Sequence, residues 1–417
     1  MKNGGGCSLN NKWVRAAIPA LLIHISVGTV YCWSTFKAAI AEQIGMSPFA
    51  VGWAFSLAIF FLGMSAAFAG NFVEKDIHKS SLVACVCFSA GMIGTGLVIH
   101  FFTGVTALLG IYLFYGAIMG IGLGVGYITP VKTLMLWFSE NKGLATGISI
   151  MGFGLAKAIA TPIMSVLVDT TGIVSMFCIL GVVYFVLMLS AHFMLKKPDG
   201  WIESNEKSFL KPGMMFGDRE FLGIWIMFFL NIHCGLMIIS YEKQLLGTAF
   251  AGASVLPLVV SVIPSVTAAF NALGRIGYST LSDGMEQRSR VYRMIFSSCA
   301  AMTFVTYSTH AVYSVAGGAT LCLFLFVINA GYGGGFSTLP ALLSERFGMK
   351  NISQIHGLAL SAWAVAGITG NNLTEIVLHN TGSYDTVLMI GMFLYVAALL
   401  VNVLVVRNKM EDQHEWS

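Results

Sequence analysis

The 417-residue sequence predicts an all-α polytopic membrane protein with twelve transmembrane helices in two pseudo-symmetric halves of six. Hydrophobic residues make up 56% of the chain and charged residues only 10%, whereas a typical soluble domain has about 25% charged residues. Uncharged runs such as 50–69 and 104–131 reach the length of about 20 apolar residues that crosses a bilayer as a helix. We therefore expect the chain to be embedded in lipid.

Glycine, proline and clustered charges divide the chain into twelve apolar segments. The expected spans are residues 13–37, 49–70, 80–101, 104–136, 144–168, 171–195, 222–241, 254–279, 291–311, 313–341, 354–376 and 384–406. The longest polar stretch lies between the sixth and the seventh span. We therefore expect an N-terminal half at 1–195, a cytoplasmic linker at 196–219 and a C-terminal half at 220–417 that ends in a short cytoplasmic tail.

Basic residues are unevenly distributed between the two sides of the expected membrane. If both termini are cytoplasmic, all but four of the 23 Lys and Arg residues lie on the inner side or at inner helix ends. The exceptions are Lys37, Lys243, Lys157 and Arg275. This bias follows the positive-inside rule, so we expect a multi-pass protein of the plasma (inner) membrane with both termini in the cytoplasm.

Short identities recur at nearly one offset. Ile23-His24 and Ile232-His233 are 209 residues apart, as are Thr129 and Thr338. Gly-Leu-Ala opens the fifth span at 143–145 and the eleventh at 357–359, an offset of 214. These repeats predict two halves related by an axis along the membrane normal, with substrate bound between them near mid-membrane.

Composition also argues against several functions. The net charge of +4 is spread over short loops, so we expect no nucleic-acid partner. The eight cysteines contain no CxxC pair, and we expect neither a metal nor a cofactor. The spans offer no nucleophile, metal cluster or paired carboxylates, so an enzyme is not expected. We expect a monomer.

Two basic residues lie deep inside expected spans, where an ionisable group costs several kcal/mol. Arg275 lies in the eighth span with Asn271 one turn away on the same face, and its guanidinium could hold a carboxylate bidentately. Alternatively, Arg275 orders the inner end of the helix. Lys157 lies past the middle of the fifth span, where it either supplies a substrate or coupling charge, or extends to the surface, or braces a neighbouring helix.

His24 and His233 occupy equivalent positions in the two repeats. Because imidazole titrates near neutrality, the pair is a candidate for accepting a coupling proton or for binding a carboxylate. The alternative for each is a packing role on an apolar helix.

Aromatic residues occur near the expected cavity and would enclose a small planar anion while supplying hydroxyl donors. These residues are Tyr31, Trp33, Tyr127, Tyr332 and Trp363. Tyr127 is the preferred candidate, whereas Trp33 also fits the aromatic belt at the membrane interface.

Four stretches together resemble the oxalate:formate antiporter family of the major facilitator superfamily, and the resemblance spans nearly the whole chain. They are 28–36 (GTVYCWSTF), 122–130 (GLGVGYITP), 137–147 (WFSENKGLATG) with 152–154 (GFG), and 361–367 (SAWAVAG). The resemblance implies the major facilitator fold. It also implies that Arg275, in its matching Gly-Arg context, meets the substrate carboxylate.

The chain departs from the oxalate-exchanging member of that family at one position. Trp363 stands where that member has a lysine in span eleven, so a monocarboxylate becomes at least as plausible a substrate as oxalate. Alternatively, Lys157 supplies the second charge from span five and restores a dicarboxylate as substrate. The similar monocarboxylate transporters carry an acidic residue one turn before the arginine of span eight, where this chain has Asn271.

We therefore predict a secondary active transporter of small organic anions. Its expected substrates are mono- or dicarboxylates such as formate, oxalate, lactate or pyruvate, moved by alternating access with either anion exchange or proton coupling. The alternatives are a proton-coupled monocarboxylate symporter and a transporter-like carboxylate sensor.

Overall fold

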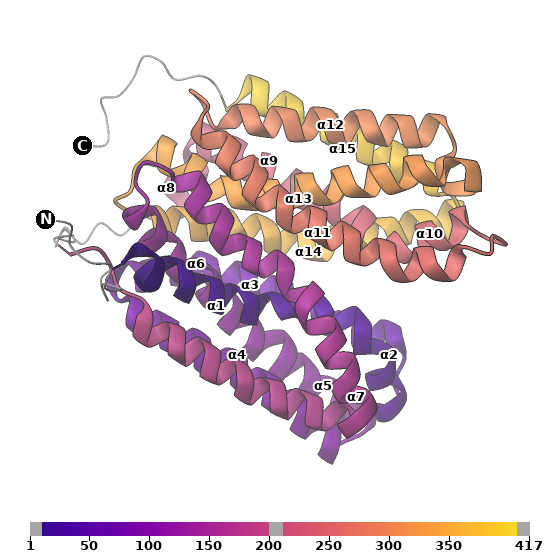
Figure 1. Ribbon diagram of the computed structural model, residues 1–417, viewed down its shortest axis with the longest axis horizontal. Coiled ribbons are helices and arrows are strands. Elements are labelled where there is room, and N and C mark those ends of the chain that lie inside the picture. Colours follow the sequence, from indigo (N-terminus) through magenta and orange to yellow (C-terminus); the bar gives the residue numbers. More distant parts are fainter. Residues whose placement is uncertain (1–10, 200–211, 407–417) are drawn as a thin grey trace, which may run out of the picture.

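The computed structural model describes residues 11–199 and 212–406, and every regular element within those ranges is a helix. Figure 1 shows two groups of helices that meet at one end of the molecule and diverge toward the other. The first group contains η1 (Trp13–Ala17), α1 (Ile18–Val27), η2 (Gly28–Cys32), α2 (Trp33–Ile44), α3 (Pro48–Lys75), α4 (Ile77–Phe101), α5 (Gly104–Ile111), η3 (Tyr112–Met119), α6 (Gly120–Trp137) and α7 (Lys142–Met194).

The second group begins after the gap in the described residues. It contains α8 (Pro212–Gly217), α9 (Arg219–Ile239), α10 (Glu242–Ala249), α11 (Leu256–Asp283), α12 (Ser289–Ser308), η4 (Ala311–Tyr313), η5 (Val315–Gly317), α13 (Gly318–Phe347), α14 (Ile352–Thr381) and α15 (Tyr384–Leu404). Most of the expected linker, residues 200–211, lies outside the described residues.

The predicted all-helical membrane architecture is confirmed. Within the described ranges, ten helices are long and apolar enough to cross a membrane. One of them, α7, bends at Gly172, where a positive φ of 83° separates the fifth span from the sixth. The 20-residue α12 completes the expected number. The sequence analysis missed α10, because this short outer helix lacks the apolar run by which a span is recognised.

Local sequence explains where several helices begin and end. Ser47 caps α3 by accepting a hydrogen bond from the amide of Ala50, and Pro48 follows at the first helical position. Asp76 caps α4 by accepting from the amides of His78 and Lys79. These polar caps satisfy amides that a membrane helix cannot leave unpaired near lipid.

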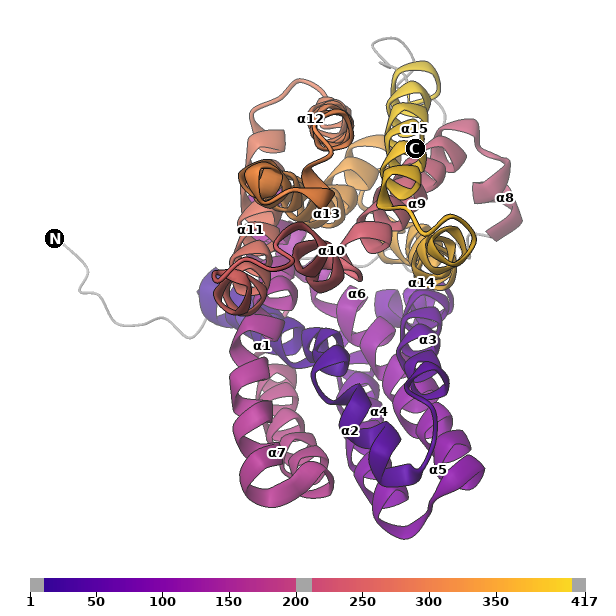
Figure 2. The same ribbon diagram turned by 90° about the vertical axis from the view of Figure 1, so that its right-hand side faces the viewer.

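The two groups of helices pack along two seams, α3 against α14 and α7 against α11 (Figure 2). We call the side where η1 begins and α15 ends the inner side. There, the two repeated Gly-Leu-Ala sequences have equivalent roles: Gly143 lies against the backbone of α11 at Ser279, and Gly357 lies against the backbone of α3 at Ala66. A Cβ atom at either glycine would collide with that backbone, so glycine is what allows the close approach.

Two carboxylates form hydrogen bonds between the two halves at these seams, on the inner side. Asp283, at the end of α11, accepts hydrogen bonds of 2.8 Å from the amides of Gly143 and Leu144 at the start of α7. Glu74, at the end of α3, accepts one of 2.7 Å from the amide of Ser353 at the start of α14. Each carboxylate therefore caps a helix of the other half, where the helix dipole favours a negative charge.

A cation supports each cap within its own half. Arg288 donates to Asp283 at 2.6 Å, and Lys132 pairs with Glu74. Glu74 and Asp283 are also 209 residues apart, the offset of the sequence repeat.

The combined substitution Glu74→Ala and Asp283→Ala is expected to open the inner side. Each lost cap costs about 1 kcal/mol, so the pair shifts a two-state equilibrium by roughly thirtyfold. Distances between spin labels at positions 140 and 290, in a background without reactive cysteines, report the separation of the halves. Asp76→Ala removes a cap within one half and should leave those distances unchanged. Unaltered distances in the double variant would show that the caps do not hold the seam.

Candidate functional site

A cavity of about 520 Å³ lies between the two halves and is lined by residues at their outer ends and near mid-span. Its walls come from both halves, with α2, α3 and α7 on one side and α9, α10, α11, α13 and α14 on the other. The inner seams close its other end. Among the described residues, the cavity therefore opens toward the side opposite the start of η1.

Four of the predicted substrate-binding residues line this cavity. They are Tyr31, Lys157, Asn271 and Tyr332. The Tyr31 and Tyr332 hydroxyls, which belong to opposite halves, lie 3.1 Å apart in a hydrogen bond. Trp33, the residue that also fits an aromatic belt, lines the cavity as well. Polar residues that the sequence singled out in different helices therefore line one cavity.

Arg275 lies just inward of the cavity and is only 1% exposed. Its Nε donates to Asn271 Oδ1 at 2.9 Å, and its Nη1 donates to the carbonyl of Ile150, in the opposite half, at 3.3 Å. Its guanidinium lies 5.7 Å from the Phe153 ring centroid and 5.4 Å from that of Phe336. The guanidinium therefore bonds to Asn271 at the cavity wall and to Ile150 across the seam. Asp283, at the inner end of α11, bonds instead to Gly143, Leu144 and Arg288.

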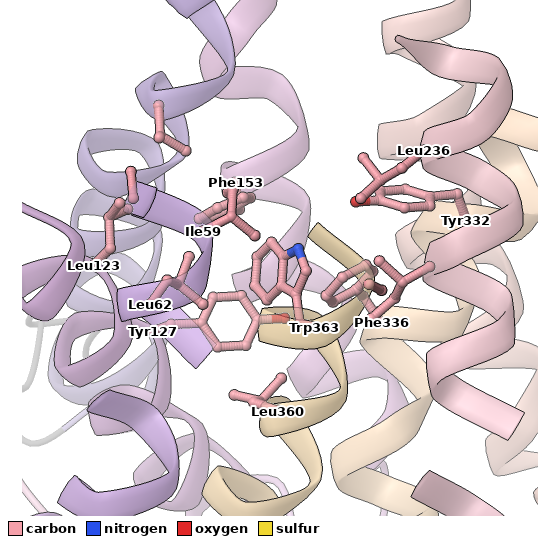
Figure 3. Packing of buried hydrophobic residues seen from close by; sticks show 14 of the residues in the cluster. Ile59, Leu62, Leu123, Tyr127, Phe153, Leu236, Tyr332, Phe336, Leu360 and Trp363 are labelled. Atoms are coloured by element: carbon pink, nitrogen blue, oxygen red, sulfur yellow. The ribbon is translucent and has the colours of Figure 1, made fainter. Parts of the chain in front are cut away.

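The remaining predicted residues, Tyr127 and Trp363, pack with Phe153 and Phe336 in one aromatic cluster (Figure 3), and the last two rings border Arg275. Their ring centroids lie 5.5 Å apart, and Trp363 lies 4.4 Å from Phe336 and 5.7 Å from Phe153. Phe153 and Phe336 were not predicted. Each stands next to glycines, in 152–154 and 333–336, and an aromatic residue beside such small residues is the signal that could have identified them.

Two glycines make room for the Arg275 side chain. A Cβ atom on Gly154 of α7 would lie 3.0 Å from Arg275 Nε and 3.1 Å from Asn271 Oδ1. A Cβ atom on Gly333 of α13 would lie 3.0 Å from Arg275 Cγ. The arginine therefore occupies a slot between helices of opposite halves, and its position depends on both of them.

The two predicted histidines are not brought together. His24 Nε2 lies 3.0 Å from the carbonyl of Tyr127, to which it must donate, and its Nδ1 lies 2.6 Å from Ser149 Oγ. His233 Nδ1 lies 2.9 Å from Thr369 Oγ1. Neither histidine lines the cavity. A third buried histidine, His356, was missed, and its ring lies 6.1 Å from that of Tyr127.

A carboxylate that the sequence did not single out, Glu242, is a neighbour of Lys157. Glu242, the first residue of α10, lines the same cavity as Lys157 and is 6% exposed. Burial raises the pKa of Glu242, and the attraction of Lys157 opposes that shift. Glu242 is therefore a negatively charged neighbour of Lys157 when its carboxyl group is ionised. The reason is that α10 packs on α11 and α13, which turns its first residue toward the cavity.

The site combines cations and hydroxyl donors with aromatic walls, an arrangement that suits a small anion. Among residues 11–199 and 212–406, no group of three or more His, Cys, Asp or Glu side chains is placed to hold a metal ion.

Comparison with known proteins agrees with this fold. The family model described as Major Facilitator Superfamily matches residues 20–371. The oxalate:formate antiporter of Oxalobacter formigenes is 24% identical, over 96% of this chain and 93% of that protein. Apicoplast pyruvate carrier 1 of Toxoplasma gondii is 20% identical, over 93% of this chain and 88% of that protein. A solved structure of a bacterial homologue of the iron transporter ferroportin, in an outward-facing state, has a TM-score of 0.72 at 10% identity, over 93% of this chain and 98% of that chain.

Gly154→Ala is expected to weaken binding of small organic anions by about tenfold or more, because overpacking costs about 1–3 kcal/mol and displaces Arg275 from Asn271. Gly52→Ala is the matched control, since a Cβ atom there meets only Lys37, at an ordinary 3.6 Å. Thermal stabilisation by formate and oxalate measures binding in both purified variants. Equal affinities in the two variants would contradict this account of the slot.

Proposed function

The chain belongs to the Major Facilitator Superfamily, and on this premise we propose that it is a secondary active transporter of small organic anions. Both termini are proposed to be cytoplasmic, in the plasma membrane, so that the cavity opens to the outside. In this mechanism the two halves, 1–195 and 220–417, rock about a bound anion and expose it alternately to either side.

The observation that carries the proposal is the buried guanidinium at the seam. Within the described residues Arg275 has hydrogen-bond partners but no carboxylate partner, although a buried cation is strongly destabilised without a negative charge. A substrate carboxylate that enters the cavity beside Asn271 supplies that charge. The Tyr31 and Tyr332 hydroxyls bridge the two halves beside this site, and we expect them to separate when the carboxylate enters, which would link binding to movement of the two halves.

The proposed substrates are mono- and dicarboxylates such as formate, lactate, pyruvate and oxalate. The relatives named above support both classes, since one is an oxalate:formate antiporter and another a pyruvate carrier. Trp363 packs on Phe336 and carries no charge, which favours a monocarboxylate. Proton-coupled monocarboxylate symport is therefore the second candidate function.

Counterflow in proteoliposomes tests the proposal directly. Vesicles are preloaded with one unlabelled anion from a panel of formate, lactate, pyruvate, oxalate and malonate, and uptake of a labelled anion is followed. At least one carboxylate should drive counterflow. Absence of counterflow with every member, by protein that is folded and inserted, would refute the proposal.

Arg275→Lys should retain membrane insertion but weaken substrate binding by roughly 30-fold or more, because losing buried charged hydrogen bonds costs about 2 kcal/mol or more. An ammonium group cannot reproduce the planar fork of a guanidinium. Arg290→Lys is the control, since that arginine lies on the exposed inner side. Normal transport by a well-expressed Arg275→Ala variant would exclude Arg275 as the substrate ligand.

Substituting both His24 and His233 by Gln tests the coupling role that their matched positions suggest. If the two histidines carried a coupling proton, transport would depend on pH with a midpoint at roughly 6 to 7, and the double variant would lose this dependence. We expect the double variant to keep the wild-type pH dependence instead, because hydrogen bonds occupy the His24 ring and neither ring lines the cavity. Uptake measured between acidic and alkaline external pH decides between the two roles.

A further inference from the structure

Glu242 is a buried carboxylate that the transport mechanism above does not use. Only 6% of the residue is exposed, and within the described residues its Oε1 has no hydrogen-bond partner. It nevertheless borders the cavity. A buried carboxylate oxygen without a donor is costly when ionised, and a proton on the carboxyl group removes that cost.

The groups around Glu242 come from each helix packed near it. Lys157 attracts it from α7 across the cavity, and Thr267 lies beside it on α11. The Thr267 hydroxyl already donates to the carbonyl of Pro264 at 2.9 Å. On α13 the nearby titratable group is Cys322, and on α10 itself the exposed Lys243. Within the described residues, Lys157 is therefore a cation that both lines the cavity and attracts Glu242.

The charges at the cavity determine which anion is neutralised there. Lys37 and Glu375 also line the cavity, and because their charges are opposite they add no net charge to it. Arg275 and Lys157 contribute two positive charges. With Glu242 ionised the remaining net charge is +1, which one monocarboxylate neutralises. With Glu242 protonated it is +2, which a dicarboxylate neutralises.

We propose, on the basis of the function proposed above, that Glu242 is a proton-binding site that sets the valence of the transported anion. A monocarboxylate binds while Glu242 is ionised. A dicarboxylate binds together with one proton, which water on the outer side supplies and which forms the O–H bond at Glu242. The net charge of the occupied cavity is then zero for both substrate classes.

Competition of oxalate against formate, measured as a function of pH, tests this inference. In the wild-type protein the oxalate-to-formate affinity ratio should fall as pH rises, because Glu242 loses its proton. Glu242→Gln should abolish that pH dependence and raise the ratio at neutral pH by about tenfold, the effect of removing one nearby negative charge. Glu375→Gln removes an exposed cavity carboxylate and should leave the pH dependence intact. A Glu242→Gln variant with the wild-type pH dependence would overturn the inference.

Charge counting also predicts a rescue that a structural role would not produce. Lys157→Met leaves the cavity with a net charge of zero while Glu242 is ionised. This variant should therefore weaken oxalate binding most and formate binding to a smaller extent. Adding Glu242→Gln to Lys157→Met restores the charge of +1 and should recover formate binding but not oxalate binding. Failure of the double variant to recover formate binding would count against the inference.

Infrared difference spectroscopy separates this inference from the proposed function. A protonated carboxyl group gives a carbonyl band that titrates with pH, and the band assigned to Glu242 is missing in Glu242→Gln. If the wild-type protein transports no carboxylate, the proposed function fails, yet the titrating band still shows whether Glu242 binds a proton. If the protein transports carboxylates and no such band exists, the inference fails alone.

Discussion

A positive charge buried between two halves of a membrane protein constrains everything near it. Arg275 cannot be solvated by lipid, so the surrounding chain must supply its contacts, and a carboxylate within the described residues is not among them. Asn271 and the carbonyl of Ile150 satisfy two of its donors, and flanking glycines let α7 and α13 approach it. Because these contacts come from both halves, relative movement of the halves must change the environment of the arginine.

The inner seams determine which side of Arg275 is accessible. Asp283 and Glu74 each cap a helix of the opposite half, so the halves are held together on the inner side and the cavity opens on the other. These contacts are few and polar, and helix amides released from them can bond to water on the inner side. The arrangement therefore favours closure without making it permanent, which is what alternating access requires.

The fold was predictable from the sequence because membrane spans leave strong local signals, and four of the candidate site residues line one cavity. The apolar runs predicted the helices, and the cost of intramembrane charge singled out Arg275 and Lys157. The helix caps Glu74 and Asp283 were missed although the repeat offset relates them. The placement of Glu242 could not be predicted, since it depends on how α10 packs against α11 and α13. His24 illustrates the opposite case, because its repeat position suggested a role while its ring bonds to Tyr127 and Ser149.

A structure determined with a bound carboxylate tests the central claim most directly. The account predicts that the carboxylate lies between the halves, within hydrogen-bonding distance of the Arg275 guanidinium and the Asn271 amide. It also predicts that the Tyr31 and Tyr332 hydroxyls, 3.1 Å apart here, have separated to admit it. A carboxylate bound elsewhere in the cavity, with Arg275 still covered and its present hydrogen bonds unchanged, would contradict the account.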